Sequence, residues 1–134
     1  MYTGMLHAHQ ALAYLLMLST TLSVAVAVAY ALYPQASLLR IGGILARGVE
    51  TSAAGLIGVI GVAMWVAIGL PLATWWMWAG LAAVVGSGVL IARFIKPSLA
   101  GLREGDRTRR WWWVGFALFH WLWISAIFGI MQSQ

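Results

Sequence analysis

The residues of this chain with the most specific chemistry are three histidines, His7, His9 and His120. His120 lies inside a long apolar segment, 111–131, and aromatic residues occupy helix-related positions around it. An imidazole among flat aromatic rings is suited to axial ligation of haem b or another tetrapyrrole. It is equally suited to a hydrogen bond between helices. In that second interpretation, the partner is a hydroxyl of the first apolar segment, such as Ser19, Thr20 or Ser23.

His7 and His9 stand near the start of the chain and are candidates for a copper, zinc or haem contact. In an extended segment both side chains could reach one ion, whereas in a helix they point to nearly opposite sides. His9 lies about ten residues from the middle of the first apolar segment, or roughly 15 Å along a helix. We therefore do not expect His9 and His120 to hold one haem between them.

Other catalytic patterns are missing from the sequence. No HExxH pair or glycine-rich phosphate loop occurs, Asp106 is remote from every histidine, and the chain has no cysteine. We expect no carboxylate inside an apolar segment, although ion-coupled transporters usually carry such groups in their spans. The sequence thus predicts no catalytic residue and makes acid–base enzymes and small transporters weak alternatives.

Four apolar segments organise the 134-residue chain, of which 63% is hydrophobic. A helix that crosses a bilayer needs about 20 residues, and the segments at about 6–33, 51–70, 73–95 and 111–131 meet this length. We therefore predict one all-α domain, a four-helix transmembrane bundle, with helix ends near Pro34, Pro71 and Pro97. Residues 35–50 alternate apolar side chains with Arg40 and Arg47, which predicts a short interfacial helix between spans 1 and 2.

All charged residues fall in two stretches, 40–50 and 93–110, which are the first and third connections. The positive-inside rule then predicts a multi-pass protein of the bacterial inner membrane, with both termini outside. The net charge of +5 lies at the membrane edge. We therefore expect membrane lipids as partners, and no nucleic acid.

Small residues and tryptophans mark two kinds of surface. Two faces are suited to close helix packing: one has Gly55, Gly58 and Gly61 in the second span, and the other has Ser19 and Ser23 in the first. Six of the nine tryptophans stand where an aromatic belt at the lipid interface is expected. These are Trp75, Trp76 and Trp78 at the outer side, and Trp111, Trp112 and Trp113 at the inner side.

The opening Met-Tyr-Thr-Gly-Met-Leu-His-Ala-His-Gln resembles the start of small four-span bacterial membrane proteins labelled "cytochrome b-like". Those proteins begin with a similar Leu-His-x-His-Ser segment and tend to carry a histidine in the second span, where this chain has none. The resemblance covers about the first 15 residues, and it implies a haem-related role for His7 and His9.

Two functions follow as expectations. The first is an accessory or structural subunit of a larger inner-membrane complex concerned with electron transfer, associated with other membrane subunits or with itself. It rests on the small size of the chain and its small-residue and aromatic faces. The second is a small haem- or pigment-binding electron-transfer protein that uses His120 as its axial ligand. A small transporter is the third alternative.

Overall fold

The structure, a computed structural model, describes residues 2–69 and 71–133. Its elements are α1 (Tyr2–Leu32), α2 (Ala36–Ile44), η1 (Leu45–Glu50), α3 (Thr51–Ile68), α4 (Trp75–Leu90), η2 (Ile91–Ile95), α5 (Lys96–Arg103) and α6 (Arg109–Gln132). The elements α2, η1 and α3 join into one continuous helix, and so do α4, η2 and α5. The described residues thus form four helices long and apolar enough to cross a membrane, as predicted.

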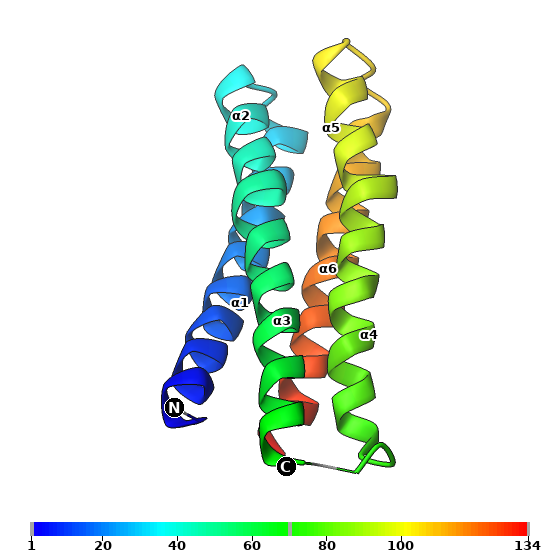
Figure 1. Ribbon diagram of the computed structural model, residues 1–134. Helices are drawn as coiled ribbons and strands as arrows, with labels where there is room; N and C mark the ends of the chain where they lie inside the picture. Colours follow the sequence, from blue (N-terminus) through cyan, green and yellow to red (C-terminus); the bar gives the residue numbers. More distant parts are fainter. Residues whose placement is uncertain (1, 70, 134) are drawn as a thin grey trace.

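The four long helices form an antiparallel bundle in which α1 contacts α3 and α6, while α4 contacts the same two helices (Figure 1). Figure 1 shows the N-terminal and C-terminal ends of the described chain at the end of the bundle that carries the α3–α4 turn. The charged connections lie at the opposite end, which we call the loop end. Three residues lie outside the described part of the chain: Met1 and Gln134, which are the predicted outer termini, and Leu70, which ends the predicted second span.

Helix ends agree with prediction at two of the three prolines. The first helix ends at Leu32, before Pro34, and the second ends at Ile68. There Gly69 adopts a left-handed conformation with φ 63°, which suits the residue after a helix C-terminus because glycine has no Cβ. Pro71 follows in the turn between α3 and α4.

The third proline does not end its helix, so the predicted stop at Pro97 is wrong. Pro97 occupies the first turn of α5, and the helix continues to Arg103. A proline removes a backbone N–H and crowds the carbonyl four residues earlier. The preceding π-helical turn η2 relieves this conflict, because wide turns of this type absorb local irregularity within a helix.

The short helix expected within residues 35–50 is not separate from the second span. Its segment is helical but runs through η1 into α3, giving one helix of 33 residues, Ala36–Ile68. The π-helical turn η1 makes this junction, and the Thr51 hydroxyl donates to the Ala46 carbonyl at 2.7 Å. The second helix therefore begins 15 residues before the predicted span of 51–70.

Packing is tightest toward the loop end. The larger buried cluster lies there, and its members are Ala27, Tyr30, Leu39, Ala46, Leu90, Ile91, Ile95, Leu99, Leu102, Trp113 and Ala117. A smaller cluster near the middle of the bundle consists of Leu16, Ala53, Ala54 and Ile124. The half of the bundle that carries the chain ends is less filled, and it contains the pocket described next.

Candidate functional site

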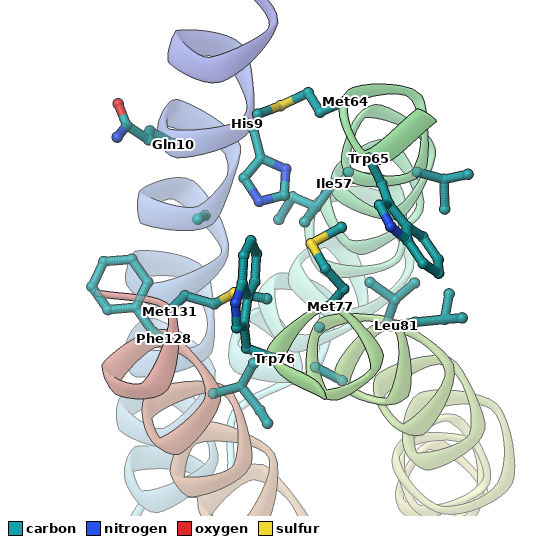
Figure 2. A pocket seen from close by; sticks show the side chains of 18 of the residues that line it. His9, Gln10, Ile57, Met64, Trp65, Trp76, Met77, Leu81, Phe128 and Met131 are labelled. Atoms are coloured by element: carbon teal, nitrogen blue, oxygen red, sulfur yellow. The ribbon is translucent and has the colours of Figure 1, made fainter. Parts of the chain in front are cut away.

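A pocket of about 370 Å³ lies between α1, α3, α4 and α6 in this less filled half (Figure 2). Its walls are aliphatic, aromatic and methionine side chains, including Met64, Trp65, Trp76 and Met77. Small-molecule sites typically have volumes of about 300–1,000 Å³, apolar walls and a few polar groups. The pocket has these properties and is our candidate binding site.

His9 is one of the few polar residues of the pocket wall. Its ring extends from α1 into the space beside α3, as Figure 2 shows. The ring lies beside Gly61, where an added Cβ would be 3.4 Å from the ring Cε1, an ordinary van der Waals contact. The ring hydrogen-bonds the Ile57 backbone, whereas its Nδ1 atom is buried without a partner among the described residues. The site therefore presents one unsatisfied imidazole nitrogen.

Ser87 is a second polar group of the pocket wall. Its side chain is fully buried, and its Oγ has no hydrogen-bond partner within the described part of the chain. Neighbouring Gly86 lies against Trp123 of α6, and the Ser125 hydroxyl meets Met17 of α1 at 3.8 Å. These contacts put Ser87 at the level of the α1 residues near Met17. That level lies about ten residues along α1 from His9, which corresponds to roughly 15 Å along the bundle. The pocket is accordingly elongated, with a polar atom toward each end.

A second cluster, the polar triad, lies closer to the loop end and joins three helices. It consists of Ser23 of α1, Glu50 of η1 and His120 of α6. The Ser23 hydroxyl donates a hydrogen bond to Glu50 Oε1, and His120 Nδ1 lies 3.3 Å from Glu50 Oε2. The carboxyl and imidazole groups are almost completely buried. Ionisable groups in this position are costly unless they pair, and they often mark functional sites in membrane proteins.

Glu50 is the residue that the sequence reasoning missed. It was assigned to a charged connection, and the expectation that no carboxylate lies inside a span is wrong because Glu50 is 0% exposed within the second helix. The periodicity of small residues could have located it. Ala46, Glu50, Ala53 and Ala54 share one helical face, and all four are buried.

His120 is buried as predicted, and its Nδ1 pairs with Glu50, which in turn accepts the hydrogen bond from Ser23 of the first helix. The Nδ1 of His120 faces a carboxylate, which is the usual orientation of a metal-ligating histidine, and Nε2 has no partner among the described residues. A flat macrocycle nevertheless does not fit on Nε2. His120 is 1% exposed and does not line the large pocket, so a tetrapyrrole there would have to separate packed helices.

The two N-terminal histidines are also placed differently from each other. Both lie in helix α1, where His7 is exposed and His9 points into the pocket. Side chains two residues apart in a helix diverge, so they do not share an ion. Within residues 2–69 and 71–133, no group of three or more His, Cys, Asp or Glu side chains is arranged to hold a metal ion.

The predicted packing residues occupy different surroundings. Gly58 lies against Val84, whose Cγ1 would be 3.0 Å from an added Cβ, and Gly61 lies against His9. Gly55 is exposed, and a Cβ added to it would meet nothing within 4 Å, so the three glycines do not form one contact face. In the first helix, Ser19 is buried and bonds its own backbone at Leu16, whereas Ser23 bonds Glu50.

The predicted lipid-interface tryptophans divide into three groups. The exposed ones are Trp75, Trp78, Trp111 and Trp112. Trp76 is half-buried and lines the pocket. Trp113 corrects the prediction: it is 1% exposed and packs against Tyr30, with ring centroids 5.7 Å apart, and against Gly42. Its position belongs to the core rather than to the lipid interface.

Comparison with protein-family models, with curated proteins and with solved structures gives no match to this chain. The functional argument therefore rests on the pocket and the polar triad.

Proposed function

We propose that this chain is a non-catalytic subunit of the bacterial inner membrane that holds an elongated apolar ligand between its four helices. The observation that carries this proposal is the 370 Å³ pocket, which side chains from all four long helices line. Close packing against the pocket walls and hydrogen bonds to the polar groups would favour a ligand here over its place among lipid chains, and the polar groups would fix its orientation.

The polar atoms of the pocket restrict the chemistry of the ligand. His9 Nδ1 and Ser87 Oγ are both unpartnered within the described chain, and an unsatisfied buried polar group is unfavourable. A ligand hydroxyl or amide can hydrogen-bond either group, while its chain contacts Met64, Met77 and Trp76. An acyl or isoprenoid chain that ends in such a group fits this description.

Photoaffinity labelling with a diazirine-bearing long-chain alcohol tests the site. We expect the label to map by mass spectrometry to pocket residues such as Met64 and Met77 in the full chain, purified in nanodiscs. Replacing Ala13, which lines the pocket, with phenylalanine should reduce this labelling about tenfold, because the ring occupies ligand volume.

The matched control is Ala11→Phe, which adds the same ring to an exposed position of the same helix outside the pocket. This variant should label like the parent chain. Labels confined to lipid-facing positions such as Val59 and Val66, with no difference between the two variants, would show that the pocket binds no such molecule.

The orientation in the membrane is part of the same proposal. The basic residues cluster toward the loop end, while the described termini lie at the other end, so the loop end should face the cytoplasm. A reporter that is active only in the periplasm, fused after residue 134, should be active. An inactive periplasmic reporter together with an active cytoplasmic reporter at the same position would reverse the topology.

The subunit character of the proposal is supported by glycines on the outside of the bundle. Gly55 of α3 and Gly88 of α4 are exposed, and a Cβ added to either would meet nothing within 4 Å. Such positions allow the backbone of another helix to approach closely. These faces would contact other subunits in a larger membrane complex, such as one concerned with electron transfer.

A further inference from the structure

A second cavity, separate from the ligand pocket, lies at the loop end between α2 and α5. It has a volume of about 330 Å³, and its lining residues are Ala36, Leu39, Arg40, Leu102 and Arg103. Two guanidinium groups therefore border one small space. Both side chains are exposed, and an anion between them would offset the repulsion between their charges.

No acidic side chain of the described chain supplies that negative group. Neither Arg40 nor Arg103 forms an ion pair with any described residue. Of the three acidic residues, Glu50 faces His120, and Asp106 pairs with Arg109 at 2.8 Å. The third, Glu104, directly follows Arg103 but is exposed and forms no ion pair with a described residue. Hydrogen bonds from Thr108 and Arg109 hold the pKa of Asp106 below its ordinary value, so this carboxylate is already engaged.

The backbone around the cavity also favours an anion. The first turn of α2, which begins the 33-residue helix, borders the cavity at Ala36. The preceding residue, Gln35, gives this turn no side-chain hydrogen bond. The start of a long helix carries partial positive charge and free N–H groups. The helix start and the two arginines thus present positive charge to the same space.

Arg103 lies against α2 beside a glycine. A Cβ added to Gly43 would lie 2.6 Å from Arg103 Nη2, so the guanidinium end of this flexible side chain rests on the α2 backbone. Next to the cavity, Ile41 and Ile44 of α2 are exposed, 43% and 57% respectively. The site therefore combines cationic groups with apolar surface, as a lipid headgroup and its acyl chains require.

We propose that this cavity binds the phosphate of an anionic phospholipid, with Arg40 and Arg103 as its ligands. Guanidinium groups bind phosphate oxygens through paired, charge-assisted hydrogen bonds. The position of the cavity at the predicted cytoplasmic end places it at the depth of the headgroups of that leaflet. The bound lipid would join the connection between α1 and α2 to the connection between α5 and α6.

Native mass spectrometry of the full chain, titrated with phosphatidylglycerol, tests this site. Arg40→Gln combined with Arg103→Gln should weaken binding of the first lipid by about tenfold more than a control double variant does. The control is Arg47→Gln combined with Arg107→Gln, which removes the same charge from exposed positions outside the cavity. Circular dichroism should show unchanged helix content for both double variants.

Two outcomes would overturn the proposal. Equal weakening in the two double variants would show diffuse attraction to the membrane surface rather than a site. Competition by inorganic phosphate as effective as that by phosphatidylglycerol would show a site for free phosphate rather than lipid. Arg103→Lys supplies a further check, because lysine keeps the charge but cannot form the paired hydrogen bonds, so its affinity should fall between parent and double variant.

Discussion

Replacement of His120 by alanine should lower the free energy of unfolding by about 3 kcal/mol or more. The change leaves the fully buried Glu50 carboxyl without its imidazole partner and opens a cavity beside it. Hydrogen bonds between membrane helices usually contribute only about 1 kcal/mol. The larger value follows from the carboxyl group, whose isolation in the interior is unfavourable.

Unfolding in detergent by increasing SDS, followed by circular dichroism, measures this effect. Glu50→Leu combined with His120→Leu is the informative companion, because it removes both partners and leaves no isolated group. We expect this double variant to lie within about 2 kcal/mol of the parent, or to exceed it. A loss under about 1 kcal/mol for His120→Ala would contradict the coupling between the two residues.

Gly42→Ala should destabilise the bundle by about 1–3 kcal/mol through overpacking. The added Cβ would overlap the ring of Trp113, and that ring is also packed against Tyr30. Neither large ring can move easily, because Trp113 is 1% exposed in the larger core cluster. The clash must therefore shift α2 away from α6.

Gly48→Ala is the matched control within the same 33-residue helix. A Cβ at Gly48 meets nothing within 4 Å, so the alanine should stabilise the helix by about 0.5–1 kcal/mol through its better propensity. The opposite signs of the two substitutions are visible as a fall and a rise in melting temperature. A rise for both would mean that α2 does not pack against Trp113.

Several features of this molecule could be predicted from the sequence because they depend on composition. Four apolar segments and the stops near Pro34 and Pro71 require only length, hydropathy and local backbone chemistry. The course of the helix through Pro97 depends instead on the wide turn η2, which no local pattern announces. Local rules therefore predicted the number of helices better than their lengths.

The candidate site was harder to predict because it arises from contacts between distant segments. The sequence predicts that His120 faces a partner and makes His9 a candidate for a metal or haem contact, but Glu50 and the pocket that these side chains face are tertiary features. The sequence places Glu50 in the charged connection because it lies close to Arg47 along the chain, yet Arg47 is exposed and Glu50 is buried. Whether a charged residue near the end of a span is buried depends on the helical face it occupies, not on its neighbours in the sequence.

The wide turn η1 has a consequence for insertions and deletions in this chain. A π-helical turn holds one more residue than an α-helical turn, so the helix before it and the helix after it keep separately defined faces. Losing one residue between Leu45 and Glu50 would let the turn close as an ordinary α-helical turn, which leaves the faces before and after it in register. Losing one residue within Ala36–Ile44, which is regular α-helix, would instead rotate the residues before it by about 100° relative to α3. The wide turn is thus the place in this helix that best tolerates a deletion of one residue.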